Sequence, residues 1–161
     1  MVARRALLAT TGLGFVGVSL AWARPGTAAN PPVTLRLSEA EWRKRLSPAQ
    51  FAVLREADTE RPFSSPLNNE HRKGIFSCAG CDLPLYSSAT KFDSHTGWPS
   101  FYAPLKQAVT TRDDRSLGMM RTEVRCRRCD GHLGHVFRDG PKPTGLRYCM
   151  NGLALKFHPQ A

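Results

Sequence analysis

Two Cys-x-x-Cys pairs constrain the fold of this chain more than any other feature of its sequence. The pairs are Cys78/Cys81 and Cys126/Cys129, and their spacing is that of two short turns that close on one tetrahedral zinc ion. The 44 residues between Cys81 and Cys126 exceed the spacing of a free-standing zinc ribbon. We therefore expect one structural zinc ion that joins two distant parts of a single domain, with a contribution to folding on the order of 10 kcal/mol. Two disulfides are the alternative for an exported chain, but Cys-x-x-Cys disulfides are usually redox-active and not structural.

The fifth cysteine, Cys149, has no partner in these pairs. It lies between Arg147 and Asn151, and two histidines, His132 and His135, precede it in a His-Leu-Gly-His stretch. A free thiol in polar surroundings indicates a nucleophile, because neighbouring polar groups can favour the reactive thiolate. The alternative is that Cys149 is a small buried apolar residue and that the histidines are structural.

The first 29 residues predict an export signal. Arg4 and Arg5 are followed by an uncharged, apolar run over residues 6–23, and small-x-small cleavage sites occur at residues 21–23 and 27–29. The signal is twin-arginine-like, although the residues after the arginine pair match that motif only in part. A transmembrane anchor and a buried helix are the alternatives, but threonines and glycines make the run only weakly apolar. We expect cleavage, a periplasmic location and no stable membrane insertion after cleavage.

Export of the folded protein also suits the cysteines. Zinc that binds in the reducing cytosol protects thiolates that disulfide-forming catalysts would otherwise reach. Removal of residues 1–29, which hold three arginines and no acidic residue, lowers the net charge from +10 to +7. The remaining positive charges are scattered and are not interleaved with aromatic residues, so we expect a solvated basic surface and no nucleic-acid partner.

Local patterns after the export signal predict a mainly β domain with short helices at its N-terminal end. Residues 30–37 are a proline-containing linker, and residues 38–161 form one domain without repeats. Capping boxes begin at Ser38 and Ser47, and each opens a short helix. The remaining expected elements are a loop at 60–69, a turn at 113–116, and strands at 74–77, 83–86, 108–112, 119–125, 146–149 and 153–157. Each Cys-x-x-Cys pair therefore follows a strand, in a body that we expect to be antiparallel.

Five stretches of the chain resemble the B-type methionine sulfoxide reductases, which are selective for the R epimer. Besides the first Cys-x-x-Cys pair, they are residues 60–63, 91–101 with its Gly-Trp-Pro-Ser-Phe, 126–137 with its Cys-x-x-Cys-x-x-His-Leu-Gly-His, and 147–151. The resemblance extends from about Ser38 to Phe157. It implies a compact β domain of two antiparallel sheets, with a structural zinc ion away from the active site.

The resemblance also implies roles for single residues. Cys149 is then the nucleophile, and Trp98 and Arg147 contribute to substrate binding, with the substrate methyl group packed against Trp98. Asn151 helps to order the site. A sulfoxide sulfur is electrophilic only when its oxygen is protonated or strongly hydrogen-bonded, so His132 and His135 are the candidate acids. The products are methionine and a sulfenic acid on the nucleophile. Trp98 could instead belong to the core.

The chain departs from the family at the residue that captures the sulfenic acid. Many members carry a second cysteine before Gly-Trp-Pro-Ser-Phe, and here that position is Thr96. The resemblance then implies an external reductant, either a thioredoxin-like protein or a small thiol. The substrate would be methionine sulfoxide in oxidised peptides and proteins, or the free amino acid. Gly152 and Ala154 also stand where serines are common, which bears only on hydrogen bonding beyond Asn151.

Two other functional classes share part of this pattern. A zinc-ribbon module that binds nucleic acid or protein needs the cysteine pairs and no chemistry, and an export signal removes nucleic acid from its reach. A thiol peroxidase or metal carrier could use Cys149, but neither requires the two histidines or Trp98. An assay with both epimers of methionine sulfoxide and dithiothreitol separates the three classes.

Overall fold

The computed structural model describes residues 34–160. The predicted export signal, residues 1–29, and the first four residues of the predicted linker lie outside the described residues. Between residues 34 and 160, no helix combines the length and the apolar character needed to cross a membrane.

Both expected helices are present and begin at the predicted capping boxes. Helix α1 (Glu39–Arg45) begins after Ser38, and helix α2 (Pro48–Glu56) begins after Ser47. In each box the serine side chain accepts a hydrogen bond from the third helical residue, whose own side chain accepts one from the serine backbone. The apolar side chains of the two helices are buried against the rest of the domain. They are Trp42 of α1 and Phe51, Val53 and Leu54 of α2.

The smaller sheet has three antiparallel strands in the order β2-β1-β9. They are β2 (Pro84–Ser87), β1 (Gly74–Cys78) and β9 (Leu155–Pro159). The last strand begins at Leu155 and not at the predicted residue 153, because residues Gly152–Ala154 form a short 3-10 helix, η4. Further 3-10 turns precede the strands of both sheets: η1 (Pro66–Asn69), η2 (Ser88–Thr90) and η3 (Ser116–Gly118).

The larger sheet has six antiparallel strands in the order β3-β4-β8-β7-β6-β5. These are β3 (Lys91–Phe92), β4 (Ser100–Phe101), β8 (Arg147–Met150), β7 (His132–Phe137), β6 (Arg121–Cys126) and β5 (Val109–Asp114). The predicted turn at residues 113–116 was two residues early, because Asp113 and Asp114 still pair with β6. Strands β3, β4 and β7 were not predicted. The fold class, two antiparallel sheets with short N-terminal helices, is confirmed.

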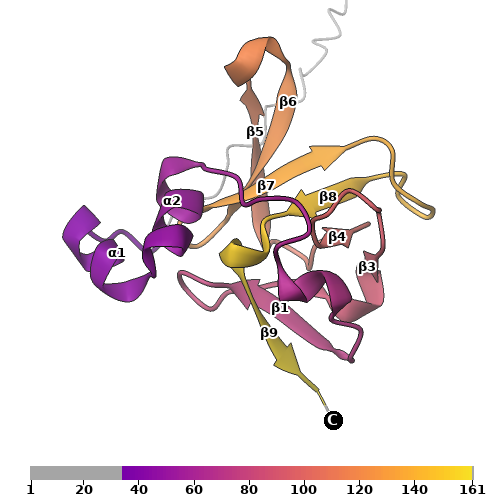
Figure 1. The fold of residues 1–161 in the computed structure, drawn as a ribbon, viewed down its shortest axis with the longest axis horizontal. Helices are drawn as coiled ribbons and strands as arrows, with labels where there is room; N and C mark the ends of the chain where they lie inside the picture. Colours follow the sequence, from indigo (N-terminus) through magenta and orange to yellow (C-terminus); the bar gives the residue numbers. More distant parts are fainter. Residues whose placement is uncertain (1–33, 161) are drawn as a thin grey trace, which may run out of the picture.

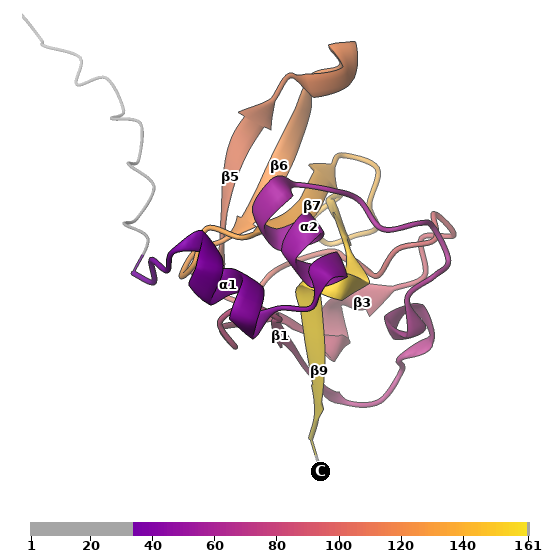
Figure 2. The same cartoon turned by 60° about the vertical axis from the view of Figure 1, so that its left-hand side comes forward.

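The core lies between the two sheets and under the helices. Phe76 of β1, Tyr86 of β2 and Phe101 of β4 are fully buried and contact one another through their rings. Helix α2 packs against β7 and η4 (Figures 1 and 2). Hairpin β5–β6 projects from this body, and its tip stands well apart from the helices and from β9.

Candidate active site

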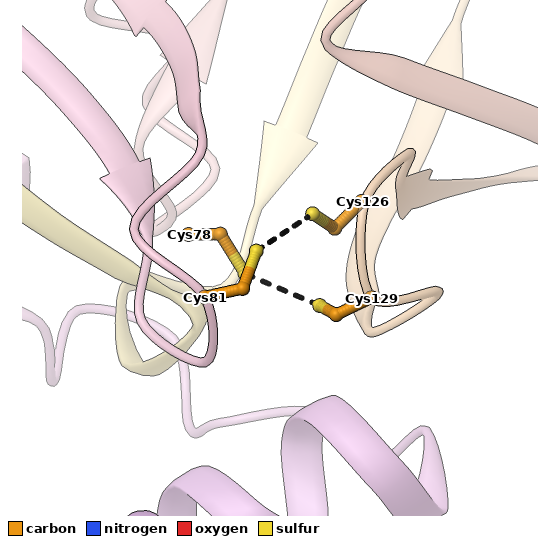
Figure 3. A group of neighbouring side chains, drawn as sticks. All are labelled: Cys78, Cys81, Cys126 and Cys129. Atoms are coloured by element: carbon orange, nitrogen blue, oxygen red, sulfur yellow. Dashed lines mark hydrogen bonds between the residues drawn. The ribbon is translucent and has the colours of Figure 1, made fainter. Parts of the chain in front are cut away.

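The four cysteines of the two pairs converge at a buried centre. Cys78 and Cys81 approach from the end of β1, and Cys126 and Cys129 from the end of β6 (Figure 3). All four sulfur atoms lie within 4.8 Å of one another, and the sulfurs of Cys81 and Cys126 are 3.5 Å apart. A disulfide would require about 2.05 Å. In a tetrahedron with Zn–S distances of about 2.3 Å the sulfurs are about 3.8 Å apart. The donor set therefore fits a structural zinc ion, and the predicted zinc site joining two distant segments is confirmed.

Two arginines lie against the same turns. Arg128 donates from Nη1 to the Cys81 carbonyl at 2.8 Å, and Arg55 of α2 donates to the Cys129 carbonyl at 3.0 Å. Their charges offset part of the net charge of minus two that four thiolates and one zinc ion carry.

Cys149 lies apart from the zinc centre, on β8 in the middle of the larger sheet. It is half-buried, and it pairs with His135 of β7 on one side and with Ser100 of β4 on the other. The approach of β7 to β8 is very close at Gly134, which has a φ of +153°, and a Cβ there would lie 2.1 Å from the Cys149 carbonyl oxygen. Glycine is therefore required between the two histidines, and it fixes where His135 stands relative to Cys149.

A small pocket of about 130 Å³ opens at Cys149. It is lined by Thr59, Trp98, Arg121, Gly134, His135, Phe137, Cys149 and Asn151. The structure thus brings together four of the residues singled out in the sequence: Trp98, His135, Cys149 and Asn151. His132 lines a neighbouring hollow of about 460 Å³ that shares Thr59, Arg121 and His135 with the first.

Each histidine is held by a carboxylate. His135 donates from Nε2 to Asp114 at 2.8 Å, and His132 donates from Nδ1 to Glu123 at 2.6 Å, because a carboxylate can only accept. These bonds fix both tautomers, so a neutral His135 presents Nδ1 as an acceptor and a neutral His132 presents Nε2. Nε2 of His132 is buried and has no hydrogen-bond partner within residues 34–160. The two rings meet edge to face, with centroids 5.4 Å apart.

In both pairs the surroundings hold the pKa of the carboxylate low, and for Asp114 hydrogen bonds from Ser116 and then from His135 do so. Burial lowers the pKa of His135, although the hydrogen bond to Asp114 raises it in part. Burial alone would raise the pKa of Glu123, but hydrogen bonds from His132, Arg112 and Arg125 outweigh it and hold the pKa at about 2. His132 therefore donates to a carboxylate that remains ionised.

Glu60, in the loop after α2, makes hydrogen bonds to two residues of the site, Trp98 and Asn151. Its carbonyl accepts a hydrogen bond from Trp98 Nε1 at 3.1 Å, and its backbone N–H donates to Asn151 Oδ1 at 3.0 Å. Its carboxylate accepts from the backbone N–H groups of Gly152 and Leu153. Burial raises the pKa of Glu60, and these two hydrogen bonds lower it in part. One residue thus holds both Trp98 and Asn151 in place.

Thr96 contacts the sulfur of Cys149 directly. Its Oγ1 lies 3.7 Å from Cys149 Sγ and is 2.8 Å from Ser94 Oγ, which in turn is 2.7 Å from Ser100 Oγ. Gly97, the next residue, has a φ of +94°, and a Cβ there would lie 2.7 Å from Pro62. The loop therefore holds a hydroxyl group at the position from which a second cysteine would reach Cys149.

The structure adds detail to two positions singled out in the sequence, Arg147 and Gly152. Arg147 pairs with Asp139 at 2.7 Å and lies over the Phe137 ring, 4.5 Å from its centroid. Asp139 and, to a smaller extent, Cys149 raise the pKa of Arg147, so its guanidinium also acts on the thiol of the pocket. At Gly152, a Cβ would lie 1.9 Å from Ser65 Oγ. Glycine is thus required here because Ser65 already occupies the space of a side chain at this position.

Several polar residues of the site were missed in the sequence. Asp114, Glu123 and Arg121 come from hairpin β5–β6, and Thr59 and Glu60 come from the loop after α2. One pattern could have revealed Glu123: it is an acidic residue beside Val124 in a predicted strand, and a carboxylate that such a strand buries is rarely left without partners. Glu60 lies in the stretch 60–63 that resembles the family, but that resemblance gave it no role, and the other three residues carry no comparable local pattern.

The chain matches one protein family and is similar to several known proteins. The SelR domain family matches residues 46–159. The chain is similar to the peptide methionine sulfoxide reductase MsrB of Agrobacterium fabrum, with 56% identity over 123 residues, covering 76% of this chain and 91% of the relative. It is also similar to the proteins of that name from Bradyrhizobium diazoefficiens (57% over 124 residues, 76% and 89% covered) and Pseudomonas putida strain W619 (57% over 122 residues, 74% and 91% covered).

Proposed function

The chain belongs to the SelR-domain family of MsrB peptide methionine sulfoxide reductases, and from this premise we propose that it reduces methionine R-sulfoxide with Cys149 as its catalytic thiol. The observation that carries the proposal is the placement of this thiol. Of the five cysteines, Cys149 alone lies outside the zinc centre, and it opens into a pocket that also holds His135 and Trp98. The enzyme is an oxidoreductase whose substrates are oxidised peptides and proteins, with the free amino acid as a smaller ligand of the same pocket.

The residues of the pocket have different roles in the first step, the reduction of the sulfoxide. The indole of Trp98 offers an apolar wall for the methyl group of the substrate. His135 is the candidate acid for the sulfoxide oxygen, held by Asp114 and with a pKa that burial moves down from its usual value. His132 lies behind it in the neighbouring hollow, where it is a second candidate acid. Arg147 lies over Phe137, a wall of the pocket, and Asn151 lines the pocket itself, where the backbone N–H of Glu60 holds its side chain.

The reaction transfers one oxygen atom and two electrons. The Cys149 thiolate attacks the sulfoxide sulfur and forms an S–S bond as the acid protonates the sulfoxide oxygen. The S–O bond then breaks as the oxygen moves to the cysteine sulfur, and the S–S bond breaks with its electron pair left on the methionine sulfur. The products are methionine, now reduced, and a sulfenic acid on Cys149, now oxidised. The structural zinc ion stabilises the fold when bound and takes no part in the transfer.

We infer that the sulfenic acid is then reduced from outside the chain. The neighbour of the Cys149 sulfur in the loop that carries Trp98 is a threonine hydroxyl, which cannot form a disulfide. The other four thiols are buried in the zinc centre. Two electrons and two protons therefore come from a thioredoxin-like protein or from small thiols, and the oxygen leaves as water.

We further propose that the enzyme repairs exported proteins in the periplasm. The support is the twin-arginine-like sequence of residues 1–29, which precedes the linker at 30–37 and the catalytic domain at 38–161. N-terminal sequencing of the protein from the periplasmic fraction should find a start near residue 30. Recovery of the uncleaved chain from the cytosol alone would refute the export proposal and leave the enzymatic one unaffected.

The deciding experiment is one turnover without reductant. Purified protein mixed with excess methionine R-sulfoxide should release about one methionine per chain and become reactive to a sulfenic-acid trap at Cys149. The S epimer should release none. Cys149→Ser should release none with either epimer while it keeps its zinc and its fold. A disulfide through Cys149 after this single turnover would refute external reduction, because it would mean that a zinc cysteine acts as the resolving thiol.

A further inference from the structure

Hairpin β5–β6 presents two methionines to solvent at its tip. Met119 is 54% exposed and Met120 is 77% exposed, and both follow the 3-10 turn that closes the hairpin. The hairpin projects from the body of the domain (Figures 1 and 2). Met150, the third methionine within residues 34–160, is fully buried, and its sulfur accepts a hydrogen bond from the Tyr86 hydroxyl at 3.1 Å.

Exposure makes the two hairpin thioethers targets for oxidants. A peroxide transfers one oxygen atom to an accessible methionine sulfur and leaves as water, and the product is a sulfoxide of either epimer. The buried sulfur of Met150 is protected from the same reagent. One chain thus carries two accessible thioethers and one inaccessible thioether as an internal control.

We propose that the hairpin tip is an oxidation site and that a second copy of this protein reduces its R-sulfoxides, so that the enzyme is one of its own substrates. The inference rests on the proposed function, and it adds Met119 and Met120 as sites of modification and repair. The repair step balances as any turnover does: the sulfoxide becomes a thioether, and Cys149 of the second copy becomes a sulfenic acid.

The geometry favours repair between molecules over repair within one. Met120 lines a groove that also includes Arg121 and Phe137, and these two side chains line the Cys149 pocket as well. They therefore form a wall common to the two hollows, with Met120 in one and the Cys149 thiol of the same chain in the other. Arg121 is held by Asp114 at 2.7 Å, and the Arg147 guanidinium lies over Phe137.

The hairpin itself cannot fold back easily. Its two strands pair without interruption from Val109–Cys126 to Asp114–Arg121. A large displacement of the tip would break this ladder, whereas the projecting tip can meet another molecule with the ladder intact. To the active site of a second copy, the exposed turn is thus equivalent to an exposed segment of any other oxidised protein.

The test uses a chain that cannot repair itself. Cys149→Ser protein is treated with hydrogen peroxide at a dose that leaves its zinc bound, the peroxide is removed, and a catalytic amount of wild-type enzyme is added with dithiothreitol. Peptide mass spectrometry should find one added oxygen on Met119 and on Met120 and none on Met150. After the enzyme has acted, about half of each hairpin signal should disappear, because one epimer of the two is a substrate.

Controls separate this inference from the proposed function. A short peptide containing methionine R-sulfoxide is present in the same reaction. Its reduction without loss of oxygen from the hairpin would overturn the inference and leave the proposed function standing, and failure to reduce either would refute the function. The double substitution Met119→Leu/Met120→Leu conserves side-chain volume and should show no oxygen gain in this segment. Wild-type enzyme that oxidises and repairs itself should do so at a rate per chain that rises with protein concentration.

Discussion

The substitution Thr96→Cys should convert the end product of a single turnover from a sulfenic acid into a disulfide. The Thr96 hydroxyl lies 3.7 Å from the Cys149 sulfur, and a disulfide has an S–S distance of about 2.05 Å. The two atoms must therefore approach by about 1.7 Å, a movement within the reach of a side-chain rotation and a small shift of the loop. Loss of the hydrogen bond between the Ser94 and Thr96 hydroxyls removes one restraint on that shift.

The size of the effect follows from the position of the new bond. The two residues are 53 positions apart, and closing a loop of that length lowers the entropy of the unfolded chain by about 14 cal/mol/K. The corresponding stabilisation is about 4 kcal/mol at 25 °C as an upper limit, since any strain in the loop subtracts from it. For a domain of this size, that free energy raises Tm by roughly 10 °C or more.

The assay compares three proteins after one turnover without reductant. Wild type should react with the sulfenic-acid trap, Thr96→Cys should not react and should show the disulfide by mass spectrometry, and its higher Tm should return to the wild-type value with dithiothreitol. Thr96→Ser, which keeps the hydroxyl and adds no thiol, should behave as wild type does. A Thr96→Cys protein that keeps a trappable sulfenic acid would show that the loop does not place residue 96 within bonding reach of Cys149.

Three further substitutions test the zinc centre, the acid and the packing around the site. Cys126→Ser should release zinc and lower the urea midpoint severely, because the remaining thiolates lose their shared cation; retention of one zinc per chain would contradict this. Asp114→Asn should lower the pKa of His135 further, and since a histidine acid is lost as pH rises through its pKa, the alkaline limb of kcat/KM should move to lower pH. Asp113→Asn, the exposed neighbour with the same charge change, should leave the profile in place, and equal shifts in both variants would exclude a specific role. Gly152→Ser should cost roughly 1–3 kcal/mol in unfolding free energy by overpacking, and an unchanged value would mean that the adjacent chain yields without strain.

The local elements of the fold were predictable because their causes are local. A capping box is formed by residues three positions apart, so Ser38 and Ser47 located both helix starts. The cysteine pairs predicted the zinc centre for the same reason, since the metal imposes the spacing within each turn. Strand β7 was missed because a glycine and two histidines give it no alternating apolar pattern, although pairing with β6 and β8 makes it a strand.

The sequence by itself determined the chemical groups of this protein: four thiols for a metal, one thiol left free, and a threonine at position 96. Only the tertiary structure decided how those groups are held. Glu60 reaches Asn151 across 91 positions of the chain, and Asp114 reaches His135 across 21. Asp114 fixes the tautomer of His135 without any pattern in its own neighbourhood, because its partner is chosen by strand pairing and not by spacing along the chain.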